Sequence, residues 1–116
     1  MVVLAKDDYY VIVYKLLSYL YSCLKKGTYV DIENLRDVIK VDIVDSYWNY
    51  IILELYKEGY IDGITKIKYI GDINENVKIN KNIRIKPKGI EFLESNSFIA
   101  KAKEFIKEAG EILFWL

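Results

Sequence analysis

The sequence contains no histidine, and it has only one cysteine and one proline among its 116 residues. Without histidine, the chain lacks the commonest general base, the imidazole ligand of many metal sites and the base of a Ser-His-Asp triad. The single Cys23 excludes an intrachain disulfide and, between Leu20 and Leu24, is expected to be a small buried hydrophobic residue. Phosphate-binding loops and dinucleotide fingerprints are also missing. We therefore expect no enzyme activity, no catalytic residue, no metal site and no cofactor.

An overall excess of basic residues is missing too. Lys and Arg number 17, Asp and Glu also number 17, and the formal net charge is zero. A strongly basic nucleic-acid-binding protein would show such an excess. The charge is unevenly distributed, however, because residues 60–90 contain seven basic and three acidic side chains, whereas both flanking regions have more acidic than basic ones. The positive charge is thus concentrated in one part of the chain.

Long apolar segments that would span a membrane are also lacking. The apolar stretch near the start contains two lysines and two aspartates within 15 residues and has no small-residue cleavage site. It is therefore neither a membrane span nor a convincing signal peptide, and we expect a cytoplasmic protein. The length and a hydrophobic content of 53% predict one domain over residues 1–116, with a core at about 7–90 and a C-terminal helix at about 97–115.

Two amphipathic helices are predicted first. Apolar residues at helical spacing continue from Val13 to Leu24, and an aspartate at position 7 or 8 can serve as the N-cap. Gly27 marks the end of this helix, because glycine readily adopts the left-handed conformation that closes a helix. A shorter helix is predicted from Asp31, as its cap, to Ile39.

A third helix is predicted from a cap at Asp45 or Ser46 to a stop at Gly59. One side carries apolar residues at helical spacing and the other side is mostly polar. The predicted core stripe comprises Trp48, Ile52, Leu55 and Tyr56, with Ile51 adjoining it. The predicted opposite side comprises Ser46, Asn49, Tyr50, Leu53 and Lys57.

The hydrophobic period changes to two after Gly59. Residues 64–70 alternate between apolar residues or threonine and lysine, which predicts a strand with one polar face. Turn-forming residues over 71–76 predict a hairpin tip, and residues 77–86 alternate again, with a bulge or break predicted at Lys81-Asn82. Pro87 suits the first turn of a fourth helix. This order predicts an α+β winged-helix fold, which is a three-helix core with a β-hairpin wing, followed by extra C-terminal helices.

The last predicted helix, capped by Ser97, carries apolar residues with the spacing of a heptad seam. Such a stripe is either docked on its own domain or shared with a second copy of the chain. We favour the second alternative, so a homodimer is predicted. The predicted dimer interface consists of Phe98, Ala102, Phe105, Ala109, Ile112 and Leu116.

Three stretches are specific enough to compare with known families. They are LLSYLYSCLKKG at 16–27, SYWNYIILELYKEGYI at 46–61 and IRIKPKGIEFLESNSFIAKAKEFIKE at 83–108. Together they resemble the YjcQ family, small proteins of low-GC Gram-positive bacteria and their phages. The resemblance implies a winged-helix-like fold and a phage-related protein, and it implies little about activity. In addition, IKPKGIEFL looks like the end of the wing in winged-helix transcription regulators.

A winged-helix fold makes double-stranded DNA the expected partner, bound through the third helix and the wing. The helix residues that reach bases or phosphates are predicted to be Ser46, Tyr47, Asn49 and Tyr50. The wing residues predicted to contact phosphates are Lys66, Lys68, Lys78, Lys81 and Arg84.

The acidic residues Asp42 and Asp45, near the start of the third helix, argue against DNA binding because they would repel phosphates. The alternative is a degenerate winged-helix protein that no longer binds DNA and acts as a protein-interaction or assembly module. In that case the wing lysines form a solvated strand face that prevents aggregation.

Overall fold

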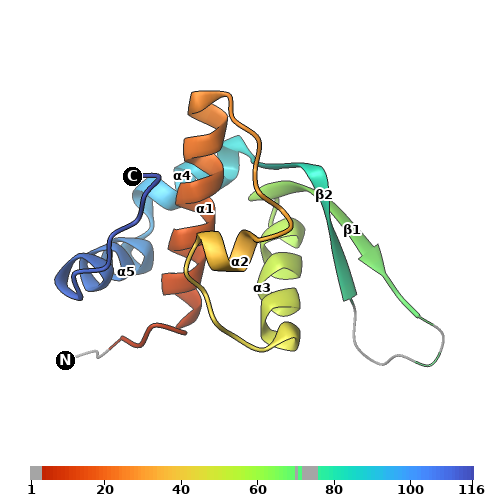
Figure 1. Cartoon of the computed structure of the whole chain (residues 1–116), viewed down its shortest axis with the longest axis horizontal. Helices are drawn as coiled ribbons and strands as arrows, with labels where there is room; N and C mark the ends of the chain where they lie inside the picture. Colours follow the sequence, from red (N-terminus) through yellow and green to blue (C-terminus); the bar gives the residue numbers. More distant parts are fainter. Residues whose placement is uncertain (1–3, 70, 72–75) are drawn as a thin grey trace.

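The computed structural model describes residues 4–69, 71 and 76–116. These residues form helices and one antiparallel hairpin, so the fold is α+β as predicted, and the arrangement is compatible with a winged-helix-like domain with additional C-terminal helices (Figure 1). The elements are α1 (Tyr9–Lys26), α2 (Leu35–Val38), α3 (Asp45–Lys57), β1 (Ile61–Ile67), β2 (Asn76–Ile85), α4 (Pro87–Ser95) and α5 (Ser97–Glu108).

Helix α1 is the centre of the core. It packs against α4, α5 and β2, and apolar residues are buried around most of its circumference. Its ends are as predicted: Asp8 is the N-cap residue and Gly27 closes the helix with a φ of 68°. The carboxylate of Asp8 nevertheless accepts its hydrogen bond from the upstream Ala5 N–H, at 2.8 Å, and does not cap the helix itself. Leu24, predicted on the apolar stripe, is half exposed.

Helix α2 is shorter than predicted and α3 matches its predicted range. Asn34 takes the N-cap position of α2, and Asp31 instead stabilises the preceding loop by accepting a hydrogen bond from the Asn34 N–H at 3.2 Å. On the core side of α3, Trp48, Ile51, Ile52 and Leu55 are buried as predicted, whereas Tyr56 is half-buried. Gly59 follows the helix with a φ of 79°. Leu53, predicted on the open side, is also buried, because α3 packs against both strands of the hairpin as well as against the core.

The hairpin contains an irregularity at the position predicted for a bulge. Ile61 pairs with Ile85, and Ile64 pairs with Ile79, so residues 80–83 lie opposite Gly63 alone. Gly63 has a φ of 85°, and a Cβ atom there would lie 2.5 Å from the Cα atom of Ile83. Glycine is therefore required at this position, where the backbones of the two strands approach closely. The turn predicted over residues 71–76 lies largely outside the described residues.

The chain reverses after α5, and the prediction of one helix to about residue 115 is wrong. Helix α5 ends at Glu108, and Gly110 adopts a φ of 72°, which turns residues 111–116 back over α1. Leu113 and Trp115 are buried by this turn. The cap of α5 also differs from the prediction, because the Asn96 side chain, and not Ser97, accepts hydrogen bonds from the first free N–H groups of the helix.

Candidate nucleic-acid interface

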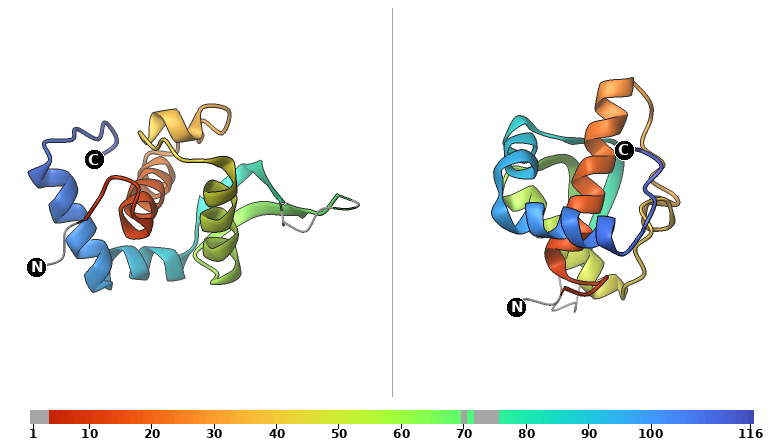
Figure 2. Two further views of the ribbon diagram at one scale, coloured as in Figure 1. Left: turned by 90° about the horizontal axis from the view of Figure 1, so that it is seen from below. Right: turned by 90° about the vertical axis from the view of Figure 1, so that its left-hand side faces the viewer.

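The hairpin projects from the helical body at the end of the molecule opposite α5 (Figure 2). The basic side chains predicted for the wing are all exposed there. They are Lys66, Lys68, Lys78, Lys81 and Arg84. A projecting ribbon with several exposed cations has the shape and charge needed to approach phosphate groups.

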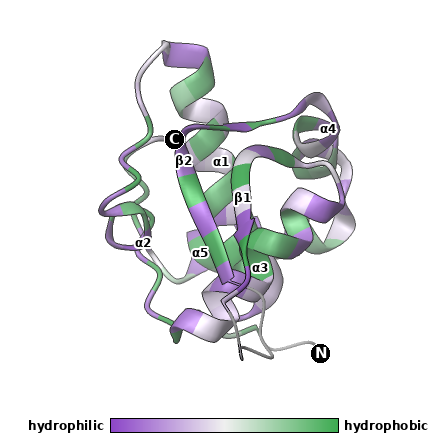
Figure 3. Ribbon diagram, turned by 90° about the vertical axis from the view of Figure 1, so that its right-hand side faces the viewer, coloured by the Kyte–Doolittle hydropathy of each residue, from purple (hydrophilic) through white to green (hydrophobic). Residues whose placement is uncertain are grey.

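The basic residues are divided between the two faces of the hairpin. Directly opposed residues in an antiparallel ladder share a face, and neighbours along a strand point to opposite faces. Lys66 pairs with Val77, and Lys78 pairs with Thr65. Lys66 and Lys78 therefore point to opposite faces, and polar and apolar residues alternate along the strands (Figure 3).

Two further polar contacts lie within the hairpin. Arg84 Nη2 is 3.7 Å from Asp62 Oδ2 on the opposing strand, and this carboxylate partly offsets the charge of the arginine. The amide Nδ2 of Asn80 donates to the Thr65 hydroxyl at 3.0 Å. The lysines are thus the clearest cationic groups of the ribbon.

Two of the four α3 residues predicted to reach DNA are attached to the region around the start of α1. The Tyr47 hydroxyl donates to the carbonyl of Asp7 at 2.7 Å. The Tyr50 ring packs edge-on against Tyr9, with 6.4 Å between centroids. Burial, together with the nearby Tyr10 hydroxyl, raises the pKa of Tyr9 to about 12, so this group is neutral at physiological pH. These contacts link α3 to Tyr9 and to Asp7, just before α1, although Tyr50 remains 56% exposed.

The other two residues differ in their surroundings. Ser46 is exposed. Asn49 is half-buried, and its amide Nδ2 donates to Asn76 Oδ1 of β2 at 3.4 Å. The residue with the best chemistry for reading adenine is therefore turned towards the hairpin.

The acidic start of α3 is partly neutralised. Arg36 Nη2 lies 2.8 Å from Asp45 Oδ1, and Arg36 Nη1 donates to the carbonyl of Ile43 at 3.2 Å. The guanidinium also lies over the Trp48 ring, 5.6 Å from its centroid. Asp42 remains exposed beside this group. Arg36 thus serves to join α2 to α3.

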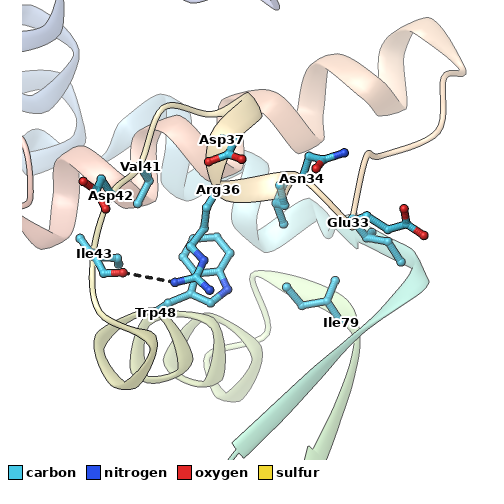
Figure 4. Close-up of a pocket in the computed structure, with 11 residues that line it drawn as sticks. Glu33, Asn34, Arg36, Asp37, Val41, Asp42, Ile43, Trp48 and Ile79 are labelled. Atoms are coloured by element: carbon cyan, nitrogen blue, oxygen red, sulfur yellow. Dashed lines mark hydrogen bonds between the residues drawn. The ribbon is translucent and has the colours of Figure 1, made fainter.

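A pocket of about 350 Å³ lies between α2, α3 and β2, and Figure 4 shows Arg36 stacked over Trp48 within it. Its charged lining residues are Glu33, Arg36, Asp37 and Asp42. Carboxylates outnumber the one guanidinium, which is already paired with Asp45. This pocket is therefore unsuited to phosphate, and the cationic surface lies on the hairpin.

The six residues predicted as a dimer seam do not lie in one helical stripe. Ala102 is fully buried in the chain's own core, and Phe105 is half-buried. Ala109 is the C-cap residue of α5, and the chain turns at Gly110 directly after it. The remaining three residues, Phe98, Ile112 and Leu116, are exposed. Phe98 lies in the first turn of α5, whereas Ile112 and Leu116 follow the reversal at Gly110, so the three residues do not share one helix face.

A buried polar stripe on α1 was not predicted from the sequence. Among the described residues, the buried polar or charged side chains are Lys15, Ser18 and Ser22. All three contact the segment 111–116. Lys15 Nζ lies 2.8 Å from Glu111 Oε1, the Ser22 hydroxyl donates to the Trp115 carbonyl at 2.9 Å, and the Trp115 indole N–H donates to the Ser18 hydroxyl at 2.8 Å. The feature of the sequence that could have indicated this stripe is Lys15, a lysine within a run of apolar residues.

The described part of the chain offers neither a metal site of the usual ligands nor a membrane-spanning helix. It contains no group of three or more His, Cys, Asp or Glu side chains placed to hold a metal ion. None of its helices is both long enough and apolar enough to cross a bilayer.

One known protein family matches most of the chain, from within α1 to four residues before the last residue. The model of the YjcQ protein family matches residues 14–112. Comparisons with curated proteins and with solved structures gave no significant match. The match contains the three stretches that carried the resemblance, and the chain belongs to the YjcQ family.

Proposed function

We propose that this protein binds double-stranded DNA as a winged-helix, transcription-regulator-like module, phage-related and without enzymatic activity. The single observation that carries the proposal is the projecting hairpin with exposed lysines beside α3 (Figures 1 and 2). In this proposal β1 and β2 form the wing, and α3 is the helix that follows the helix-turn-helix bend after α2.

The distribution of charge supports the hairpin as the contact surface. Its lysines are exposed, whereas the α2 side carries Glu33, Asp37 and Asp42 around the pocket. Phosphates would be attracted to the hairpin and repelled from α2. A zero net charge is compatible with this orientation, because the interaction depends on the local charge within about a Debye length.

The first test is the salt dependence of DNA binding. If four of the wing cations contact phosphates, log Kobs should fall against log salt concentration with a slope of about −4. Replacing Lys66 and Lys68 together by glutamate should weaken binding by about tenfold or more, at roughly 0.7 kcal/mol or more per lost contact, and bring the slope to about −2. Fluorescence anisotropy with a duplex at several salt concentrations measures both quantities.

The matched control is Lys103→Glu/Lys107→Glu, which makes the same charge change on exposed residues of α5, at the opposite end of the molecule (Figure 2). Its slope should equal that of the parent. A parent affinity that does not vary with salt, or an equal loss in both double variants, would refute the wing as the contact surface.

The second candidate function is a protein-interaction module that does not bind DNA. It is favoured by an apolar strip on the outer side of the segment 111–116, where Ile112, Phe114 and Leu116 are exposed by 70%, 81% and 71%. Single exposed apolar residues are common, but three within five residues make a candidate contact surface. Association of two copies through this strip is the form of homodimer that we propose.

The strip is tested by Phe114→Asp. If two copies associate there, this change should convert a dimer to a folded monomer in sedimentation velocity, because it removes the apolar ring and a carboxylate is costly to desolvate between two copies. Lys40 Nζ, 5.0 Å from the Phe114 ring centroid, can offset part of the new charge but cannot restore the apolar contact. Tyr29→Asp is the control, since it makes the same kind of change at a residue that is 96% exposed and is not part of the strip. A parent that sediments as a monomer rules out the homodimer, and a parent that also fails to bind DNA would leave interaction with a different protein.

A further inference from the structure

We propose that the protein binds duplex DNA without sequence preference, with lysines on the two faces of the hairpin contacting the two phosphate walls of one groove while α3 stays off the base edges. This inference rests on the function proposed above and names the class of its target. It follows from three observations: the attachments of the α3 side chains, the charge at the start of α3, and the division of the lysines between the hairpin faces.

The α3 side chains are poorly placed to distinguish bases. Sequence is read in the major groove mainly by Arg or Lys on guanine and by Asn or Gln on adenine. Asn49 is half-buried and donates to Asn76, and Tyr47 donates to the Asp7 carbonyl. Ser46 is exposed, but a serine hydroxyl pairs with several base edges and so discriminates weakly.

The charge at the start of α3 also keeps this helix away from DNA. A recognition helix contacts base edges through its N-terminal residues, which brings that end close to the phosphates. Here Asp42 and Asp45 are exposed at that end, and the one nearby guanidinium, Arg36, is held by Asp45 and the Ile43 carbonyl. Inserting this end would place carboxylates beside phosphates and would be unfavourable.

The hairpin, unlike the start of α3, carries exposed basic residues that can contact phosphates. Lys66 and Lys78 point to opposite faces of a ribbon that projects beyond the helices. A ribbon lying flat on one phosphate backbone would use the lysines of one face only. A ribbon inserted into a groove has a phosphate wall on each side, so both lysines are used. The proposed lysine contacts are made to phosphates, which every sequence presents alike, so these contacts carry no sequence information.

The experiment is anisotropy titration of the full chain against three duplexes of equal length, AT-rich, GC-rich and mixed, at several salt concentrations. The variants are Lys66→Gln, Lys78→Gln, the double variant Lys66→Gln/Lys78→Gln, Ser46→Ala and Asn49→Ala. Each variant is first shown to unfold at the same temperature as the parent. We expect the three duplexes to bind within about threefold of one another. Each lysine variant should reduce the magnitude of the salt slope by about 0.9 on every duplex, and the double variant by about twice that. Ser46→Ala and Asn49→Ala should change Kd by no more than about twofold.

Three outcomes overturn the inference. A preference above about tenfold for one duplex, removed by Asn49→Ala or Ser46→Ala, would show that α3 reads sequence, with DNA binding itself intact. A change of slope in only one lysine variant would show that the hairpin lies flat on one strand. Failure of the parent to bind any duplex would refute the proposed function together with the inference.

Discussion

Replacing Glu111 by alanine should lower the free energy of unfolding by about 3 kcal/mol. Lys15 is a residue of α1 whose side chain is only 2% exposed, and its ammonium nitrogen lies 2.8 Å from Glu111 Oε1. Its second contact is the carbonyl of Lys40, at 3.0 Å. Removal of the carboxylate leaves a buried charge with one neutral acceptor, and breaking a buried ion pair in this way typically costs about 3–5 kcal/mol. We place the loss at the lower end because Glu111 is 19% exposed and water can partly replace it. Urea denaturation followed by circular dichroism measures the change.

The two partners of this pair should not respond equally. Lys15→Met removes the buried charge itself, and Glu111 can then be hydrated at its exposed side, so the loss should be only about 1 kcal/mol from the unpaired Lys40 carbonyl. The double variant Lys15→Met/Glu111→Ala should be more stable than Glu111→Ala alone, because no buried charge remains. A single Glu111→Ala variant as stable as the parent would mean that this ion pair does not hold the segment 111–116 in place.

Replacing Gly63 by alanine should lower the free energy of unfolding by about 2–6 kcal/mol. Two costs add. Gly63 has a φ of 85°, which strains any residue with a Cβ atom by about 1–3 kcal/mol. The new Cβ would also lie 2.5 Å from the Cα atom of Ile83, so the backbone of β2 has to move, and overpacking of this kind costs about 1–3 kcal/mol.

The control for Gly63 is Gly27→Ala. Gly27 has a φ of 68°, and a Cβ atom there meets no atom within 4 Å. Only the left-handed strain remains, so the expected loss is about 1–2 kcal/mol. The difference between the two variants measures the close approach of β1 and β2. Equal losses of unfolding free energy at the two positions would show that the backbone of β2 moves at little cost to accommodate the new Cβ atom. Gly63→Ala should also weaken DNA binding if the hairpin is the contact surface.

Local residue patterns were enough to predict most of the elements. The helical spacing of apolar residues located α1 and α3, and the alternation of lysines with apolar residues located the hairpin. These signals come from contacts within one element, or between one element and solvent, and are therefore present in the sequence itself. The end of α5 differs from its local pattern. The heptad spacing continues through Ile112 and Leu116, but Gly110 reverses the chain, and burial of Leu113 and Trp115 on α1 then decides the path.

The exposure of the five basic residues predicted for the wing follows from the sequence, since a charged residue in an alternating strand faces solvent. Their arrangement does not. Lys66 and Lys78 lie on opposite faces because of the register in which the two strands pair. Asn49 contacts Asn76, a residue 27 positions away in the sequence. Neither arrangement can be predicted from the residues around each position.

The sequence by itself determined the class of this protein: an α+β chain with a cationic ribbon after three helices, with no histidine and one cysteine, and with three stretches that match the YjcQ family. The tertiary structure decided which surfaces remain available. It turned Asn49 towards the hairpin, paired Asp45 with Arg36, and folded residues 111–116 over the buried Lys15. The physical reason is that composition and periodicity record the surroundings averaged along one element, whereas hydrogen bonds and ion pairs depend on distances of a few ångströms between elements remote in sequence.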